Sequence, residues 1–271
     1  MKDKIKVVII GFAHMHVNEI ALYISQQPDM KLTGCADVKP EIPEISEARY
    51  TRAWNMKNVC QTYNVILYSD YKDMLDVLKP DAAFVLTENT KKFEVAEECA
   101  KRNINVIIEK PIAVSLEEAK KIKEISERYG IEVIVNWPTT WRPYIYRMKN
   151  ALDNKIAGDL IRMHYINGHT GPLGVGARHR GVTENAENMT DEEKSKTWWY
   201  RAENGGGAFL DICCYGCMYS RFLNKEKAIS VMAYSANLNT KFSNAEDNVA
   251  AIIRYPSAMS VIEATWTVHQ A

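Results

Sequence analysis

In the first half of the chain, short apolar runs alternate with stretches in which apolar residues recur at helical spacing. The runs predict strands and the periodic stretches predict helices between them. Strands that are apolar throughout are typical of a parallel sheet covered on both faces. The predicted strands are residues 5–10, 32–36, 65–68, 82–86, 104–108 and 131–135, and the predicted helices are residues 16–27, 71–78, 91–102 and 116–129. A further helix is expected near residues 45–54.

After Asn136 the strand-like runs alternate more between apolar and polar residues, which favours an antiparallel sheet. The elements expected here are a helix at 144–152, a loop at 170–196, a helix after Gly205-Gly206-Gly207, and strands at 159–168, 228–236, 248–255 and 259–267. The predicted fold class is α/β, with an N-terminal Rossmann doubly wound parallel sheet and a C-terminal α+β domain on an open, largely antiparallel sheet. Because the sequence stops just after a predicted strand, we expect a truncated second domain or a partner that covers its sheet.

Composition narrows the class of protein. The 271 residues include 34 basic and 34 acidic side chains, and this balance gives no reason to expect a nucleic acid or an anionic membrane as partner. No apolar run is long enough to span a bilayer. Six cysteines without the spacing of a disulfide framework are typical of a reducing compartment, so a cytoplasmic location is expected.

The loop after the first predicted strand is a partial dinucleotide fingerprint, which has glycine at its first, third and sixth positions. Gly11 supplies the first glycine, Ala13 is a small substitute for the second, and His16 replaces the third. Asp37, at the end of the second strand, has the spacing of the acid that binds the adenosine ribose hydroxyls and would repel a 2′-phosphate. NAD is therefore the expected cofactor, although Lys39 leaves NADP open. The cofactor-binding residues expected here are Gly11, Phe12, Ala13, His14, Met15 and Asp37.

Two further segments carry groups suited to catalysis. Glu109-Lys110-Pro111 follows the fifth strand, where a lysine points into the crevice in which open α/β sheets bind ligands. In the block from Gly205 to Gly216, Asp211 and Tyr215 are four residues apart, so a helix would put them on one face. A carboxylate beside a phenol, facing a lysine, is an arrangement for proton transfer. Lys110, Asp211 and Tyr215 are therefore the candidate catalytic residues.

Taken in order, these segments resemble the glucose–fructose oxidoreductase / inositol dehydrogenase / MocA family over nearly the whole chain. Thr87 and Asn89, after the fourth strand, add to the match, and the resemblance implies that they and Glu109 help to bind the cofactor. Most of the family has a histidine four residues after the aspartate. Tyr215 at this place resembles the branch with glucose–fructose oxidoreductase and the dimeric dihydrodiol and xylose dehydrogenases. Glu88, where proline is usual, departs from the family pattern, as does His16.

The resemblance implies an NAD(P)-dependent enzyme that transfers a hydride between nicotinamide and a CH–OH carbon of a sugar, polyol or related small hydroxy compound. Residues 1–136 would be the dinucleotide-binding domain, and residues 137–271 the substrate-binding and oligomerisation domain. Lys110 would hold the substrate hydroxyl and the nicotinamide ribose, Tyr215 would exchange the hydroxyl proton, and Asp211 would orient the sugar. A homodimer or homotetramer through the C-terminal sheet is also implied.

Several other residues are candidates for substrate contact. Aromatic walls against a sugar ring could come from four tryptophans, although such residues are as often core. The candidates are Trp137, Trp141, Trp198, Trp199 and Arg201. Residues 178–180, with sequence Arg-His-Arg, could hold an anionic group, but a solvated charge run is the simpler explanation.

Two alternative functions stay open. His14 and His16 also resemble the metal pair of barrel amidohydrolases, with His164 and His169 as the available further ligands. This interpretation leaves Glu109-Lys110-Pro111 unexplained. A nucleotide-binding protein without turnover is the other alternative, favoured by the incomplete fingerprint. No metal site is expected, because the Cys-x-x-Cys at residues 214–217 has no second cysteine pair nearby and buried inert thiols explain it better.

Overall fold

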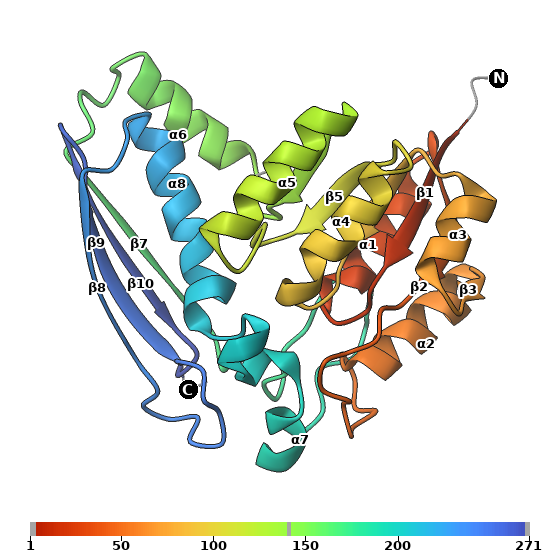
Figure 1. The fold of residues 1–271 in the computed structure, drawn as a ribbon. Coiled ribbons are helices and arrows are strands. Elements are labelled where there is room, and N and C mark those ends of the chain that lie inside the picture. The colour runs from red at the N-terminus through yellow and green to blue at the C-terminus, as the bar shows by residue number, and fades with distance from the viewer. Residues whose placement is uncertain (1–3, 140–141, 269–271) are drawn as a thin grey trace. The chain divides into compact units, whose positions relative to one another are not determined.

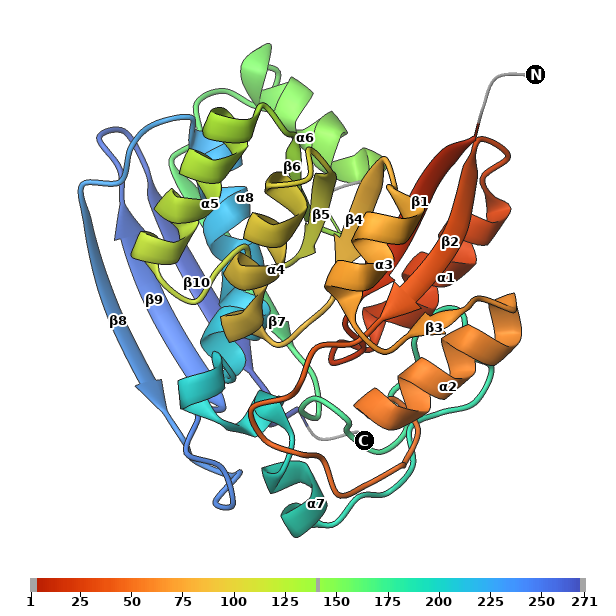
Figure 2. The same ribbon diagram turned by 45° about the vertical axis from the view of Figure 1, so that its right-hand side comes forward.

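The computed structural model describes residues 4–139 and 142–268 (Figures 1 and 2). The chain forms two compact units. The first consists of Met1–Asn136 with Leu173–Gly205, and the second of Trp137–Pro172 with Gly206–Ala271. The chain therefore leaves the first unit after β6, returns to it through a long connection, and then completes the second unit.

The first unit is built on a six-stranded sheet in which every strand pair is parallel. Its order is β3-β2-β1-β4-β5-β6, so the direction of winding switches between β1 and β4. The strands are β1 (Ile5–Ile10), β2 (Met30–Ala36), β3 (Leu67–Tyr68), β4 (Ala82–Val85), β5 (Asn105–Glu109) and β6 (Val133–Asn136). This order confirms the doubly wound prediction, and ligands of such sheets bind at the carboxyl ends of the strands near the switch.

Helices cover both faces of this sheet (Figure 1). Helices α1 (His16–Gln26) and α2 (Arg52–Tyr63) pack on one face, and α3 (Tyr71–Leu78), α4 (Lys92–Ala100) and α5 (Leu116–Tyr129) on the other. Strand β1 is apolar and buried from Val7 to Ile10, because Val7 and Ile9 point to the first face while Val8 and Ile10 point to the second. All four side chains are fully buried, and each contributes about 1.5–3 kcal/mol of burial free energy.

The predicted helix at residues 45–54 is wrong, because α2 begins only at Arg52. Residues 45–50 are not helical, and Tyr50 has a φ of 76°, which interrupts a helix. Its hydroxyl donates to the Glu184 carbonyl at 3.0 Å. The buried positions of α2 are Arg52, Asn55 and Val59, so the helix has almost no apolar periodicity by which the sequence could place it.

The segment that returns to the first unit, Leu173–Gly205, includes most of the loop predicted at residues 170–196. It contains the short helix α7 (Asp191–Ser195) and two 3₁₀ turns, Trp198–Tyr200 and Ala202–Asn204. The expectation of a loop through residue 196 is therefore wrong at α7, which Thr190 caps by accepting from the Glu193 N–H at 3.2 Å.

The second unit has a four-stranded sheet in the order β7-β10-β9-β8. The β9 pairings with β8 and β10 are antiparallel and the β7–β10 pairing is parallel, which confirms a largely antiparallel sheet. Its elements are α6 (Pro143–Asp153), β7 (Arg162–Gly168), α8 (Cys214–Asn224), β8 (Ser230–Ala236), β9 (Asn248–Arg254) and β10 (Met259–Thr265). Helix α8 lies close against the sheet at Gly216, where a Cβ would come within 2.6 Å of Ile262 and 2.7 Å of Tyr165.

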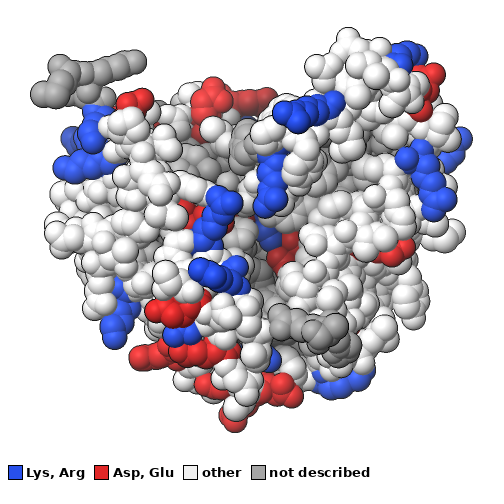
Figure 3. Space-filling model, turned by 180° about the vertical axis from the view of Figure 1, so that it is seen from behind, with Lys and Arg blue, Asp and Glu red and all other residues white. Residues whose placement is uncertain are grey.

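Charged side chains of both signs are interspersed on the face drawn in Figure 3. Within residues 4–139 and 142–268, every helix is too short or too polar to cross a membrane.

Candidate functional site

The loop between β1 and α1 lies at the switch of the first sheet. Gly11 has a φ of 96°, and a Cβ there would lie 2.6 Å from the Thr87 amide nitrogen, so only glycine fits without displacing backbone. The Gly11 N–H donates to the Ala36 carbonyl at 2.9 Å. These contacts bring the ends of β1, β2 and β4 together, so the structure gathers the predicted cofactor residues of this loop with Asp37 and Thr87. Phe12, Ala13, His14 and Met15 are all buried in the same loop.

The Asp37 carboxylate is held by an arginine that the sequence did not single out. Its Oδ1 accepts from Arg52 Nη1 at 2.8 Å and from the Val38 N–H at 2.8 Å. Arg52 Nη2 also donates to Glu88 Oε1 at 2.5 Å, which gives the unusual Glu88 a structural role. Burial raises the pKa of the Glu88 carboxyl, although the Arg52 cation opposes that rise. The sequence did not indicate that Arg52 holds Asp37 and Glu88, because α2 has too little apolar periodicity to show which of its residues are buried.

A buried lysine holds the backbone of Glu109-Lys110-Pro111. Lys92 is 1% exposed, and its Nζ donates to the carbonyls of Glu109 at 2.6 Å, Pro111 at 2.8 Å and Lys110 at 3.2 Å. It also donates to Asn89 Oδ1 at 2.7 Å. Asn89 Nδ2 in turn donates to the Gly205 carbonyl at 2.7 Å. A buried ammonium needs such acceptors, so Lys92 and Asn89 together set the backbone from which Lys110 projects.

Sequence reasoning missed Lys92, although a signal was present. Lys92 shares the buried face of α4 with Val95, Ala96 and Cys99. A lysine on an otherwise apolar helix face is costly unless it has partners, and this position could have been recognised for that reason. Lys110 itself is buried at the end of β5.

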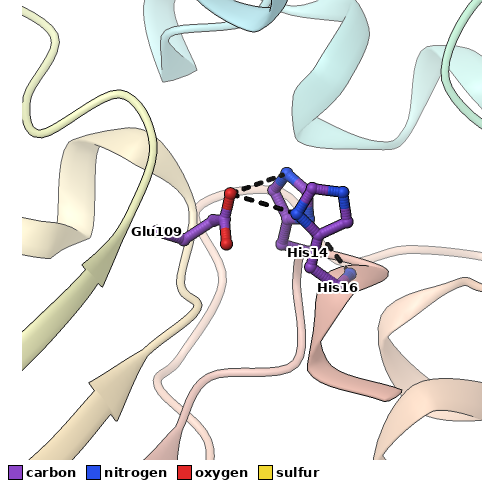
Figure 4. A group of neighbouring side chains, drawn as sticks. All are labelled: His14, His16 and Glu109. Atoms are coloured by element: carbon purple, nitrogen blue, oxygen red, sulfur yellow. Dashed lines mark hydrogen bonds and ion pairs between the residues drawn. The ribbon is translucent and has the colours of Figure 1, made fainter. Parts of the chain in front are cut away.

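The Glu109 side chain points toward two histidines of the β1–α1 loop (Figure 4). Its Oε1 lies 3.1 Å from His16 Nδ1 and 3.9 Å from His14 Nε2, and its Oε2 accepts from Asn136 Nδ2 at 2.8 Å. Burial alone raises the pKa of the Glu109 carboxyl, but His16, Lys110 and Asn136 outweigh it and hold that pKa below its usual value. Burial, then the His16 and Lys110 charges, hold the pKa of His14 well below its usual value. Glu109 is therefore an anion beside a neutral His14.

Two of the predicted sugar-contact tryptophans lie in the core of the first unit. The Trp198 and Trp199 rings stack with centroids 3.9 Å apart, and both are buried. Trp198 Nε1 donates to the Ala13 carbonyl at 2.9 Å, and the Trp199 ring packs edge-on against His14 at 4.8 Å. Arg201 Nε donates to the Ser195 carbonyl at 2.8 Å. The two tryptophans therefore support the fingerprint loop, whereas this Arg201 contact lies within its own segment. Trp141 lies outside the described residues.

The second unit holds Asp211 and Tyr215. The expectation that one regular helix carries both is wrong, because Asp211 lies in a π-helical turn, Phe209–Cys213, and α8 begins at Cys214. Asp211 Oδ2 accepts from Trp266 Nε1 at 3.0 Å and lies 3.2 Å from His169 Nε2. Tyr215 is buried, with its ring edge-on to Trp137 at 5.4 Å. The Asp211–His169 pair joins residues far apart in sequence, and the sequence did not predict it.

The amidohydrolase alternative is wrong in its fold. His14 and His16 follow a strand of an open six-stranded sheet, whereas that alternative requires a closed barrel. Its further ligands belong to the second unit, where His164 Nε2 lies 3.3 Å from Glu263 Oε1 and His169 pairs with Asp211. Burial raises the pKa of Cys213, two residues after Asp211, to about 12, so this thiol stays protonated.

The chain matches two family models in succession. Residues 5–137 match the oxidoreductase family with the NAD-binding Rossmann fold, GFO_IDH_MocA. Residues 145–271 match the GFO/IDH/MocA C-terminal domain. The two family models together match nearly the whole chain, with the N-terminal domain model followed by the C-terminal one.

Two curated relatives are similar at low identity. D-xylose 1-dehydrogenase [NADP(+)] of Haloarcula marismortui is 23% identical over 189 residues, which are 69% of this chain and 48% of that protein. scyllo-Inositol 2-dehydrogenase (NAD(+)) of Bacillus subtilis is 20% identical over 256 residues, which are 94% of this chain and 64% of that protein. The chain thus spans about half of the first relative and less than two thirds of the second.

Solved structures share the fold. GenD2 from gentamicin A biosynthesis, in complex with NAD, has a TM-score of 0.79 at 16% identity and covers 100% of this chain and 68% of its own. An oxidoreductase from Agrobacterium radiobacter, in complex with NAD+, L-tartaric acid and magnesium, has a TM-score of 0.74 at 15% identity and covers 99% and 68%. At these identities the likeness establishes the fold alone.

Proposed function

Because this chain belongs to the Gfo/Idh/MocA oxidoreductase family, we propose that it binds NAD and transfers a hydride between nicotinamide and a CH–OH carbon of a sugar or polyol. The observation that carries this proposal is the pair of family matches over residues 5–137 and 145–271. The first unit would bind the dinucleotide and the second the substrate. A related small hydroxy compound would suit the same chemistry.

The first unit fits a dinucleotide. Gly11, with a φ of 96° and no room for a Cβ beside the Thr87 backbone, makes the tight turn that the first glycine of the dinucleotide fingerprint makes. The N-terminus of α1 follows this loop and favours negative charge. Asp37, at the end of β2, would bind the adenosine ribose. Further cofactor contacts would come from Thr87, Asn89 and Glu109, together with Phe12, Ala13, His14 and Met15.

The proposed reaction assigns one task to each candidate catalytic residue. When bound, the nicotinamide supplies the hydride chemistry. Lys110 would hold the substrate hydroxyl and the nicotinamide ribose, and Tyr215 would take or return the hydroxyl proton. Asp211, held by Trp266 and His169, would accept hydrogen bonds from the substrate. Trp137, beside Tyr215, would line the substrate site, with Trp199 and Arg201 as further candidates.

The function is tested by identifying the cofactor and then the substrate. Native mass spectrometry of the purified chain should show NAD after incubation with both nicotinamide dinucleotides. An absorbance screen at the reduced-nicotinamide band should then reveal turnover with a member of a panel of aldoses, polyols and their acids. NAD binding without turnover over the whole panel would instead favour the non-catalytic alternative.

Changing Asp37 to Asn is expected to lower the preference for NAD over NADP about tenfold, which corresponds to about 1.4 kcal/mol. The amide removes the charge that repels a 2′-phosphate, while Arg52, 2.8 Å from Asp37 Oδ1, remains beside it as a cation. Calorimetric titration gives the two dissociation constants without any need for turnover.

The matched control for this change is Asp76→Asn. Asp76 also pairs with an arginine, Arg102, at 2.7 Å, but it lies on the surface of α3. The control should leave both dissociation constants unchanged. An unaltered NAD/NADP ratio in Asp37→Asn would exclude Asp37 from the ribose site.

We also propose that a second copy of the chain covers the open face of the second sheet. Met232, Ile252 and Val261 are in register across β8, β9 and β10 and share one face. Met232 is 76% exposed and Tyr234, on the same face, is 78% exposed. An apolar face of this kind is typical of an interface between proteins.

This second copy is tested by charging the sheet face. Sedimentation velocity should show a dimer or tetramer for the chain. Met232→Lys should raise the dissociation constant of this oligomer at least about tenfold, because the ammonium would be buried in the interface. Val231→Lys is the matched control, since Val231 is adjacent on β8, similarly exposed, and on the opposite face. A monomeric parent chain at all concentrations contradicts the proposal.

A further inference from the structure

His14, His16 and Glu109 form a compact group of donor atoms in the first unit (Figure 4). One ligand atom from each of these residues lies within 4.8 Å of the other two. The histidines come from the β1–α1 loop and the first position of α1, and Glu109 from the end of β5. The strand order therefore assembles the group from positions 93 residues apart.

One atom of this group points to a ligand independently of the grouping. His14 is 2% exposed, and its Nε2 has no hydrogen-bond partner among the residues that the structure describes. It faces Glu109 Oε1 at 3.9 Å, which is too far for a hydrogen bond. Leaving a buried polar atom unsatisfied costs about 1–3 kcal/mol, so Nε2 needs a partner: a hydrogen-bond acceptor while it carries the ring proton, or an ion once that proton is on Nδ1.

We propose that His14, His16 and Glu109 bind a divalent transition-metal ion of the zinc class. Two imidazole nitrogens and a carboxylate oxygen are a ligand set that such ions use in proteins, with a further position left for an oxygen ligand. In a tetrahedral site with bonds near 2.0–2.1 Å, ligand atoms lie about 3.3 Å apart. The His16–Glu109 distance of 3.1 Å already suits this geometry, and the His14–Glu109 distance of 3.9 Å needs a small contraction.

The surroundings of the group include an outer contact that such sites require. Asn136 Nδ2 donates to Glu109 Oε2 at 2.8 Å, which orients the carboxylate and leaves Oε1 directed at the histidines. The Trp199 ring packs against His14 and restricts its imidazole. The site would therefore be largely preformed, with little side-chain ordering left for the ion to impose.

Two contacts must change when the ion binds. The 3.1 Å hydrogen bond between His16 Nδ1 and Glu109 Oε1 gives way to coordination of the ion by both atoms. The His16 backbone N–H donates to His14 Nδ1 at 3.2 Å, which assigns the His14 proton to Nε2. Coordination by Nε2 moves that proton to Nδ1 and opens this hydrogen bond. This step costs about 1–3 kcal/mol, because the His16 N–H has no partner within the helix and loses its acceptor, and the ion–nitrogen bond must exceed that cost. The competing interpretation is that His14, His16 and Glu109 bind no ion, and that His14 and Glu109 serve only as the cofactor contacts that the proposed function assigns to them.

The test uses isosteric variants of the full chain, purified without a histidine tag and stripped with a chelator. His14→Gln and His16→Asn each place an amide nitrogen near the ligand position of the imidazole, and Glu109→Gln removes only charge. Equilibrium dialysis against Zn²⁺, read by elemental mass spectrometry, should give one saturable ion per parent chain. Each variant should weaken its dissociation constant by about a hundredfold. His164→Gln, at an exposed histidine–glutamate pair, should bind like the parent.

Cobalt provides a second measurement. Co²⁺ added to the parent should give visible absorption of a low-symmetry site that includes imidazole, and the three variants should lose it while His164→Gln keeps it. Circular dichroism confirms that each variant is folded. The proposal is overturned if the folded parent binds no saturable ion or if the variants bind as it does. If the parent binds no metal and the variants lose NAD binding, the metal proposal is also overturned, and His14, His16 and Glu109 belong to the cofactor site.

Discussion

Lys110→Met should lower turnover about a thousandfold while the affinity for NAD changes by less than about tenfold. Methionine keeps the length and apolar stem of a side chain that is buried at the end of β5, and it removes only the ammonium. In the proposed reaction this ammonium holds the hydroxyl that loses its proton, so its loss raises the barrier by about 4 kcal/mol. Steady-state kinetics on the substrate found in the panel, with calorimetric titration of NAD, separate the two effects.

The control for Lys110 is Lys101→Met. Lys101 follows α4, its side chain is 42% exposed, and it pairs with Glu97 and Glu98 on the surface. Surface pairs of this kind contribute little, so turnover and NAD affinity should both match the parent. If Lys110→Met keeps full turnover with intact NAD binding, Lys110 does not have the proposed role.

Tyr215→Phe should lower kcat by about a hundredfold to a thousandfold and leave KM and NAD affinity nearly unchanged. The ring stays against Trp137, 5.4 Å away, and only the hydroxyl that would exchange the proton is lost. An effect on kcat alone identifies an interaction made in the transition state rather than a packing contribution.

Tyr146→Phe is the matched control for Tyr215. Tyr146 lies on α6 of the same unit and is 47% exposed, so loss of its hydroxyl should not change turnover. If Tyr215→Phe is as active as this control, the tyrosine is a core residue and another group must move the proton. Thermal unfolding of both variants checks that neither change disturbs the second unit.

Local patterns predicted most of the elements. The helices at residues 71–78 and 116–129 have the predicted bounds, because Asp70 and Ser115 cap them and their buried faces repeat with helical spacing. Strand β1 was predicted at 5–10 because its side chains are apolar on both faces. One element that these patterns missed is α2. Its buried face includes Arg52 and Asn55, which form hydrogen bonds, so the apolar periodicity that usually indicates a helix is absent.

Part of the candidate site was also within reach of the sequence. Gly11 and Asp37 follow strands at fixed spacings, and strand ends of a parallel sheet share one edge, so their proximity could be predicted. The partners that hold them could not. Arg52, Lys92 and Trp198 reach this edge from segments whose packing depends on contacts distant in sequence. The spacing that predicted Asp211 and Tyr215 on one helix missed the π-helical turn at Phe209–Cys213.

The strands and helices, the doubly wound class and the resemblance to the family could be read from the sequence itself, because apolar periodicity, caps and motif residues act over a few positions. Only the tertiary structure decided that His16 meets Glu109 across 93 positions, and that His14 is left with an unsatisfied buried nitrogen. The physical reason is that such contacts depend on which strand ends lie side by side and how tightly the loops between them pack, and no local pattern records either.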